Sequence, residues 1–140
     1  MSDRTIDELE EAECLRLIAQ GGIGRIAYQS RLGLVVLPVN YKWHDGAVVF
    51  RTTQHSPLDE DLQTGIAGGD YKVAFEIDDI DAVGRQGWSV LIQGPAHHVS
   101  EADRAAAVEA GVESWPGGER ELFVRIVPSR VTGRRVRPTL

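Results

Sequence analysis

The residues of this chain that could bind an anion are Arg51 and Ser56, which flank a short polar stretch in the middle of the sequence. In a predicted strand, Arg51 and Thr53 would lie on one face and Phe50 and Thr52 on the other, so one face carries a guanidinium and a hydroxyl side by side. Ser56 and Pro57 then have the spacing of a helix start, with serine as the N-cap and proline at the first helical position. A helix N-terminus carries free N–H groups and a partial positive charge, so an arginine and hydroxyls beside it would suit a phosphate.

A purely structural interpretation of the same stretch is also open. In that interpretation, Ser56 only caps its helix and Arg51 is a solvated residue of the sheet. The run of Asp59, Glu60 and Asp61 favours it, because these acids already suit the helix dipole and would repel an incoming phosphate. The residues alone therefore leave a phosphate site and an ordinary helix cap as alternatives.

A predicted β-hairpin positions this stretch. Asp45-Gly46 is the dipeptide that a two-residue hairpin turn prefers, because such a turn needs positive φ. The sequence therefore predicts antiparallel strands over residues 34–43 and 47–53. Pro38 lies in the middle of the first strand and cannot donate a ladder hydrogen bond, so we expect a bend, a bulge or an edge there. Such a break would leave backbone groups just after the proline open to a flat ligand, although an ordinary bulge explains it equally well.

The N-terminal segment is predicted to form an amphipathic helix over residues 6–20. The run from Thr5 to Glu8 matches a capping box, and the apolar residues that follow fall on about half of the helical circumference. Gly21 and the glycine after it would end the helix. Cys14, the one cysteine of the chain, lies on the apolar side, and nothing nearby in the sequence would make it a thiolate. We therefore expect a buried, inert thiol and no intramolecular disulfide.

The rest of the chain has the pattern of short strands separated by turns. Further strands are predicted over residues 24–29, 71–77, 87–99 and 121–127, with an extended segment at 131–135 and short helices at 56–64 and 100–111. The connections are too short for parallel crossovers. The pattern therefore predicts one domain over residues 1–140, an antiparallel barrel or curled sheet with peripheral helices.

Three other motifs are not expected to bind ligands. The Gly-x-Gly-x-x-Ala run at 22–27 resembles a dinucleotide fingerprint, but a helix precedes it and a strand follows, which is the wrong order. The acids within 78–81 lack the glycine and the bidentate glutamate of a calcium loop, so we expect them in a solvated loop. His97 and His98 are consecutive in a strand and point to opposite faces, which prevents them from ligating one metal together. No metal site is predicted.

The composition excludes some classes of partner. The net charge is −6, which argues against bulk attraction to nucleic acid or to an anionic membrane. No signal peptide or membrane-spanning run is evident, so a cytoplasmic location is expected. Five arginines are concentrated near the C-terminal end: Arg125, Arg130, Arg134, Arg135 and Arg137. They could bind phosphates or contact the acidic face of a partner subunit, and it is equally possible that they are exposed on an edge strand.

Several segments, taken in order, resemble a known family. They span nearly the whole chain: Gly24-Arg25-Ile26-Ala27-Tyr28, Pro38-Val39-Asn40-Tyr41, Val49-Phe50-Arg51-Thr52-Thr53, Val73-Ala74-Phe75-Glu76-Ile77-Asp78, Gly87-Trp88-Ser89-Val90-Leu91 and Val131-Thr132-Gly133-Arg134-Arg135. The sequence is similar to the pyridoxamine 5′-phosphate oxidase-like flavin-binding split barrels. The resemblance implies a six-stranded antiparallel split β-barrel that forms a homodimer and binds FMN, or in related branches the deazaflavin F420, between its subunits.

The resemblance also implies which residues hold the cofactor. The strand that contains Pro38, Val39, Asn40 and Tyr41 would lie along the isoalloxazine. The phosphate and ribityl end would be held by Arg51, Thr52, Thr53, Ser56 and Leu58, and Trp88 and Ser89 would contact the cofactor from an adjoining strand. Pro57 and Leu58 stand where many relatives carry basic residues. The phosphate charge would therefore have to be met by Arg51, by the helix N-terminus, or by Arg134 or Arg135.

The leading hypothesis from the sequence is an FMN-dependent oxidoreductase that acts as a homodimer on a small-molecule substrate, in which the flavin transfers the hydride or electron. No general acid or base can be named, although Tyr41, His55 and Trp88 could border a substrate pocket. Oxidation of pyridoxamine phosphate itself is not expected, because no second basic cluster is available for a substrate phosphate. F420 binding is the first alternative. A non-catalytic flavin- or haem-binding module is the second.

Overall fold

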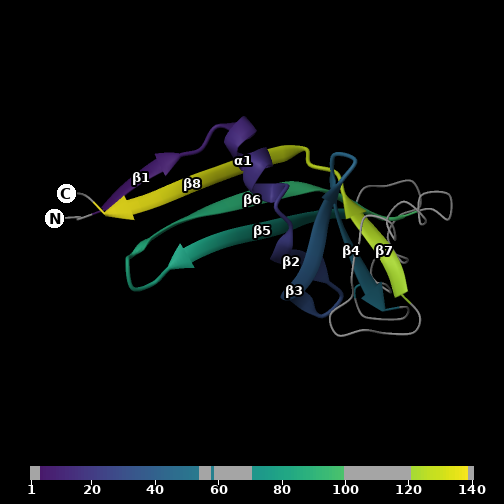
Figure 1. Ribbon diagram of the computed structural model, residues 1–140. Coiled ribbons are helices and arrows are strands. Elements are labelled where there is room, and N and C mark those ends of the chain that lie inside the picture. The colour runs from purple at the N-terminus through teal and green to yellow at the C-terminus, as the bar shows by residue number, and fades with distance from the viewer. Residues whose placement is uncertain (1–3, 54–57, 59–70, 100–120, 139–140) are drawn as a thin grey trace.

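The computed structural model describes residues 4–53, 58, 71–99 and 121–138, and these form one helix and eight strands (Figure 1). In chain order the elements are β1 (Arg4–Glu8), α1 (Glu11–Ile18), β2 (Gly22–Ser30), β3 (Gly33–His44), β4 (Ala47–Thr53), β5 (Tyr71–Asp81), β6 (Gln86–His98), β7 (Glu121–Ile126) and β8 (Arg130–Pro138).

Six of these strands close into a ring. Their order is β6-β5-β2-β3-β4-β7, every pair is antiparallel, and β7 pairs back to β6 through residues 96–98. The other part of β6, residues 87–93, pairs instead with β8, which in turn pairs with β1. In Figure 1, β1, β8, β6 and β5 extend together to one side, away from β4 and β7. The prediction of a six-stranded antiparallel split barrel is therefore confirmed, with β8 and β1 added beside it.

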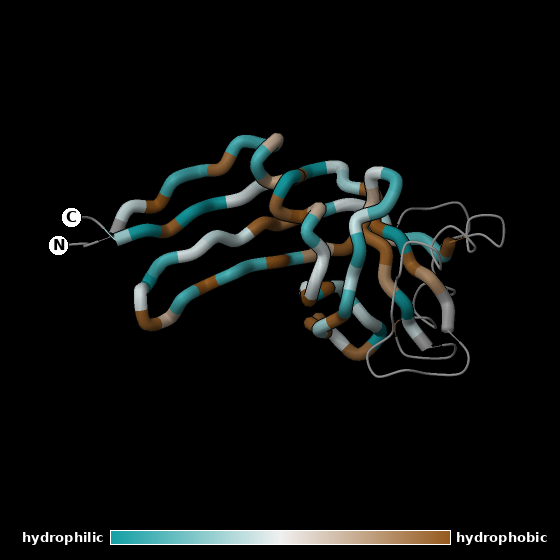
Figure 2. The backbone as a smooth tube through the Cα atoms, in the orientation of Figure 1, coloured by the Kyte–Doolittle hydropathy of each residue, from teal (hydrophilic) through white to brown (hydrophobic). Residues whose placement is uncertain are grey.

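The core of the barrel follows from strict alternation along the strands. In β5, Val73, Phe75 and Ile77 are buried, while Lys72 is exposed. Figure 2 shows hydrophobic and hydrophilic residues alternating along the long strands β5 and β6. The ring of Phe75 stacks on Phe50, with the ring centroids 6.4 Å apart. This packing ties β5 to β4 through the centre of the barrel.

The hairpin expected at residues 45 and 46 is confirmed. Asp45 has φ 51° and Gly46 has φ 72°, and β3 and β4 pair from His44↔Ala47 to Tyr41↔Phe50. Pro38 lies opposite Arg25 of β2, outside the part of β3 that pairs with β4. On that side β3 has no neighbour among the described strands, so the missing N–H of the proline removes no ladder bond with β4. This is the edge position that the sequence allowed.

The predicted N-terminal helix is wrong in its first part and correct in its second. Residues Arg4–Glu8 form β1, and the helix covers only Glu11–Ile18. The side chain of Asp7 forms an ion pair with Arg137 of β8 at 2.8 Å, and Ile6 is 63% exposed rather than buried. Pairing with β8 thus overrides the local capping signal. Within α1, Cys14 is buried as predicted, and its burial raises the pKa of the thiol.

The loop predicted for the acids after residue 77 is also wrong, because β5 continues to Asp81. Asp78 pairs with Ser89 and Asp79 with Trp88 of β6, so the acids belong to the extension of the sheet that β5 and β6 form with β8 and β1. The partner strand supplies the backbone hydrogen bonds that a row of acids would not suggest. The helices predicted at 56–64 and 100–111 lie outside the described residues, apart from Leu58, which is 3% exposed.

Within the described segments, no helix has the length and apolar character needed to cross a bilayer. The same segments contain no group of three or more histidine, cysteine, aspartate or glutamate side chains that could hold a metal ion.

Replacing Tyr41 by phenylalanine should lower the free energy of unfolding by about 0.5–1.5 kcal/mol, the usual net contribution of one hydrogen bond, because the carbonyl of Ile18 still accepts the N–H of Gly21. Tyr41 is 3% exposed, and its hydroxyl donates a hydrogen bond to the carbonyl oxygen of Ile18 at 2.9 Å, at the end of α1. Urea denaturation measures the loss. Tyr71→Phe is the matched control, because the hydroxyl of Tyr71 donates to the carbonyl oxygen of Gln29 at an exposed position. Equal losses in the two variants would contradict the prediction.

Candidate functional site

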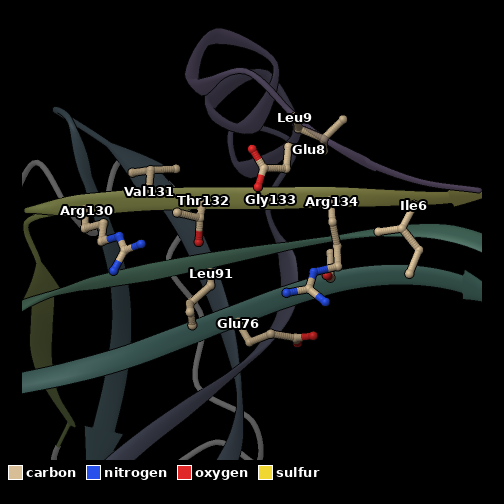
Figure 3. A pocket seen from close by; sticks show the side chains of 11 residues that line it. Ile6, Glu8, Leu9, Glu76, Leu91, Arg130, Val131, Thr132, Gly133 and Arg134 are labelled. Carbon is tan, nitrogen blue, oxygen red and sulfur yellow. The ribbon is translucent and has the colours of Figure 1, made fainter.

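A groove of about 830 Å³ lies on the outer face of the sheet, opposite to the barrel core. It runs over β5, β6 and β8 and is bordered by β1 (Figure 3). We call it the outer groove. Its polar lining consists of two carboxyl groups, two guanidinium groups and two hydroxyl groups, and its floor includes Leu91; the polar residues are Glu8, Glu76, Arg130, Arg134, Ser89 and Thr132. In Figure 3, the side chains of Glu76 and Arg134 extend over the same part of the groove from the two strands that flank β6.

Strand pairing explains how residues far apart in the sequence reach this face. One row of directly opposed residues crosses five strands: Pro38 on β3, Arg25 on β2, Glu76 on β5, Leu91 on β6 and Thr132 on β8. Directly opposed residues lie on the same face of a sheet. The outer face is therefore one continuous surface that stretches from the groove to β3.

A second hollow of about 310 Å³ continues the outer groove toward β2 and β3. The two hollows share Glu76 and Leu91. Five residues line the second hollow but not the outer groove. Ala27, Val36 and Ala74 are small or apolar, and Arg25 and Asp78 add one guanidinium and one carboxylate. The surface therefore combines a basic, hydroxyl-rich part over β8 with a flatter apolar part over β2.

Glu76 lies where the two hollows meet. An oxygen of its carboxyl group is 3.8 Å from a guanidinium nitrogen of Arg25, and the same nitrogen is 3.7 Å from the carboxylate of Asp78. Burial raises the pKa of Glu76 to about 7, the hydrogen bond and negative charge of Asp78 add to the increase, and Arg25 opposes it. The carboxyl group of Glu76 therefore holds a proton for part of the time at neutral pH.

The four residues predicted to lie along a flavin ring occupy consecutive positions on β3 and alternate between its faces. Pro38 and Asn40 are on the outer face, and Val39 and Tyr41 point toward the core. The ring of Tyr41 packs edge-on against Phe75 at 5.1 Å, and burial raises the pKa of its hydroxyl to about 12. On this face of β3, a ligand would meet the side chains of Pro38 and Asn40, and only the backbone of the other two.

The residues predicted to hold a phosphate are only partly within the described chain. Arg51 is half-buried on β4, on the strand face opposite to Phe50, and its guanidinium lies 4.9 Å from the centroid of the Phe123 ring of β7. Thr52 is half-buried, and Leu58 is buried in the core cluster. The side chain of Thr53 and all of Ser56 lie outside the described residues. Arg51 lines neither the outer groove nor the second hollow.

Trp88 and Ser89 are adjacent on β6 and serve different hollows. Ser89 lines the outer groove, whereas Trp88 is half-buried and packs against the barrel core. With Arg135 and Arg137, Trp88 also lines a third hollow of about 440 Å³. The guanidinium of Arg135 is 3.5 Å from the carboxylate of Glu13 on α1. The structure thus places Ser89, Pro38 and Arg134 on one continuous face, and it places Arg51 and Trp88 elsewhere.

Glu76, Leu91 and Thr132 lie in the groove but are not among the site residues predicted from the sequence. Each is an outward position on a strand that was predicted, so alternation alone marks it as exposed. Only the register between strands puts Glu76 beside Arg25 and Leu91 beside Thr132. A prediction of strand pairing would have been needed to find the groove.

Comparisons with known proteins give the family. The profile of the pyridoxamine 5′-phosphate oxidase family matches residues 10–135. An uncharacterized protein of Mycobacterium tuberculosis is 32% identical over 135 residues, which cover 96% of this chain and 88% of that protein. Among solved structures, an FAD-binding protein of Mycobacterium smegmatis is 32% identical, with a TM-score of 0.72 over 92% of this chain and 98% of that one.

A haem-binding protein of Mycobacterium smegmatis shares the fold, with a TM-score of 0.64, 19% identity, and coverage of 88% of this chain and 53% of that one. The profile match extends over most of the described strands, and the FAD-binding structure matches in both sequence and fold. The chain belongs to the pyridoxamine 5′-phosphate oxidase family.

Proposed function

We propose that this protein is a flavin-dependent oxidoreductase that works as a homodimer, binds FMN between its two subunits, and acts on a small-molecule substrate. Family membership and the FAD-binding relative support a flavin. The observation that carries the proposal is the continuous outer face, which joins a polar groove that contains Arg130 and Arg134 to a flat apolar surface. A flavin mononucleotide has two matching parts, an anionic tail that would lie in the groove and a flat ring that would lie on the apolar surface. F420, which also has an anionic tail and a flat ring, is the alternative cofactor.

The residues of the outer face fit such a group. The small side chains of Ala27 and Ala74 leave a flat surface for a ring, and Pro38 and Asn40 continue that surface along β3. An anionic tail needs cations, and guanidinium groups are the side chains best suited to phosphate. Arg51, Arg130 and Arg134 are the candidates, with the hydroxyl of Ser89 beside the last two in the groove. A bound flavin would supply hydride or electron transfer, and the protein would supply binding and orientation.

The candidate residues lie on different strands and do not line one common hollow, which supports a site shared by two subunits. Arg51 lies on β4 beside Phe123, whereas Ser89 lines the outer groove over β5, β6 and β8. A cofactor that uses both would take Arg51 from one subunit and the groove from the other. The outer face also exposes apolar side chains that a partner would cover, since Leu34 is 81% exposed, Val36 63% and Ile23 48%.

A non-catalytic flavin- or haem-binding module is the second candidate. Leu58 is buried and uncharged, so the position after Pro57 brings no positive charge to a phosphate. A weaker hold on FMN would suit a carrier or sensor, or a different cofactor. The haem-binding relative shares only the fold with this chain, and haem is therefore one of the cofactors to be tested.

The absorption spectrum of the protein as purified, with mass identification of the released ligand, tests the proposal. We expect a flavin spectrum and the mass of FMN, together with bleaching when a nicotinamide or another common reductant is added. The mass of F420, FAD or haem would replace FMN by that cofactor. A bound flavin that no reductant bleaches would favour the carrier. Protein that is colourless, and stays so after FMN is added, would contradict flavin binding.

A further inference from the structure

We infer that Glu76 determines which ligand tails the outer groove accepts. When its carboxyl group carries a proton, it donates a hydrogen bond to an oxyanion held by Arg130 and Arg134, and when it is ionised it repels that oxyanion. Binding of the anion is therefore coupled to the uptake of a proton. This inference rests on the proposed function, because it specifies how the anionic tail of the cofactor is recognised.

Glu76 lies across the groove from the cationic groups. It is directly opposite Leu91 of β6, which is directly opposite Thr132 of β8, and Ser89 is opposite Arg134 in the next row on this face. Neighbouring strands are about 4.8 Å apart, so the backbones at the two ends of the first row are separated by roughly 10 Å. Figure 3 shows Arg134 extending from β8 toward the side from which Glu76 comes. An oxyanion over Leu91 would therefore reach the carboxyl group from one side and a hydroxyl and a guanidinium from the other.

One guanidinium serves two carboxyl groups on the β5 side of the groove. Nη1 of Arg25 is 3.8 Å from Oε1 of Glu76 and 3.7 Å from the carboxylate of Asp78, and both distances exceed the usual length of a charge-assisted hydrogen bond. Oε1 of Glu76 is also buried and has no hydrogen-bond partner among the described residues. Ionisation of both carboxyl groups would leave a poorly compensated negative charge at this oxygen, so Glu76 is the group that keeps a proton.

The coupling has a defined sign. Burial raises the pKa of Glu76 to about 7, Asp78 raises it further, and Arg25 opposes the increase. An anion in the groove adds a negative charge, which raises this pKa again. Affinity for the anion is therefore highest below about pH 7, and it falls as the pH rises from there to the higher pKa of the complex. The charged groups that face Glu76 are Asp78 on β5, Arg25 on β2, Arg130 and Arg134 on β8, and Glu8 on β1, while β6 contributes the uncharged Ser89 and Leu91.

A neutral tail would not be coupled to protons in this way. The unphosphorylated ribityl chain of riboflavin adds no charge to the groove, so it leaves the pKa of Glu76 unchanged by this route. The groove should therefore distinguish FMN from riboflavin strongly when Glu76 is protonated and weakly when it is ionised. Glu76 is thus a specificity-determining residue of the proposed site.

Sulfate tests the coupling without a flavin. Its charge does not change between about pH 6 and pH 9, and the charges of arginines and ordinary carboxylates are constant there too. Binding in the groove is followed by the NMR shifts of the Ser89 and Thr132 amides. We expect the dissociation constant to rise about tenfold across this pH range. The pKa of Glu76, read from the ¹³C shift of its carboxyl carbon, should rise in saturating sulfate by the amount that corresponds to the same factor, because linkage is reciprocal.

Three variants assign the effect to Glu76 and to the groove. Glu76→Gln has an N–H donor in place of the acidic O–H and cannot ionise, so at pH 9 it should bind sulfate within about threefold of the constant of the original protein at pH 6. Asp45→Asn is the matched control, because it removes an exposed carboxylate from the β3–β4 turn, where asparagine tolerates the positive φ, and it should behave like the original protein. Arg134→Gln should abolish the amide shifts. Circular dichroism at each pH verifies that every variant is folded.

The outcomes separate this inference from the proposed function. Sulfate binding in the groove that is equal at pH 6 and pH 9, a pH dependence that persists in Glu76→Gln, or no sulfate binding at any pH would each overturn the inference. If sulfate shows the coupling and FMN does not bind, the proposed cofactor fails and the role of Glu76 stands. If FMN binds and sulfate shows no coupling, only the inference fails.

Discussion

Replacing Phe75 by alanine should lower the free energy of unfolding by about 3–5 kcal/mol, the largest loss that we expect from any single core truncation here. Its side chain is fully buried and lies between two other aromatic rings, Phe50 at 6.4 Å and Tyr41 at 5.1 Å. Gly24 of β2 approaches the same ring so closely that a Cβ there would clash with it. The side chain therefore joins β2, β3, β4 and β5, and its removal would leave a cavity that rigid strands cannot fill.

Urea denaturation of the purified protein measures this effect, with the transition followed by circular dichroism. Leu32→Ala is the control, because Leu32 is 98% exposed in the turn between β2 and β3, and its truncation should change stability by no more than about 0.5 kcal/mol. A Phe75→Ala protein that unfolds at the same urea concentration as the original would show that the barrel centre is not the main source of stability.

The second large effect concerns the cofactor. We expect Arg51→Ala to weaken binding of FMN by about 1.5–3 kcal/mol, or roughly 10- to 150-fold, the usual loss for a charge-assisted hydrogen bond. The guanidinium is held beside the ring of Phe123, and the neighbouring Val49 is buried against the same residue. This support restricts the arginine to few conformations, so its position is largely set before a phosphate arrives.

Titration of the apoprotein with FMN, followed by fluorescence quenching, measures the dissociation constant. Arg51→Lys keeps the charge but loses the planar fork, and should fall between the original protein and the alanine variant. Arg31→Ala removes an exposed arginine from the β2–β3 turn and should leave the constant unchanged. An unchanged constant in Arg51→Ala would remove this residue from the cofactor site.

Local chemistry was enough to predict the features of the fold that depend on a few adjacent residues. Asp45 and Gly46 adopt the positive φ angles that the hairpin needs, and the alternation from Val73 to Ile77 marks the buried side of β5 correctly. These features need no knowledge of the rest of the chain. The family resemblance added the closed six-stranded ring, which local patterns left open between a barrel and a curled sheet.

Features that depend on distant partners could not be predicted in the same way. The run Thr5–Glu8 has a helix-capping pattern, but it forms a strand because it pairs with β8, for example at Asp7↔Arg135. Asp78 and Asp81 resemble loop residues, but β6 supplies their hydrogen bonds. The same limit applies to the site, because nothing in the sequence around Glu76 shows that Thr132 lies two strands away on the same face.

The divided pairing of β6, with β8 along one part and β7 along the other, affects how the nascent chain can assemble. The ring cannot close until residues 121–126 have left the ribosome, because β7 joins β4 to β6. Until then, β4 and β6 each present an open edge, because β8 follows β7 in the chain, and open edges readily pair with strands of other chains. High temperature or rapid expression should therefore favour aggregation during synthesis, even though the completed barrel protects these edges.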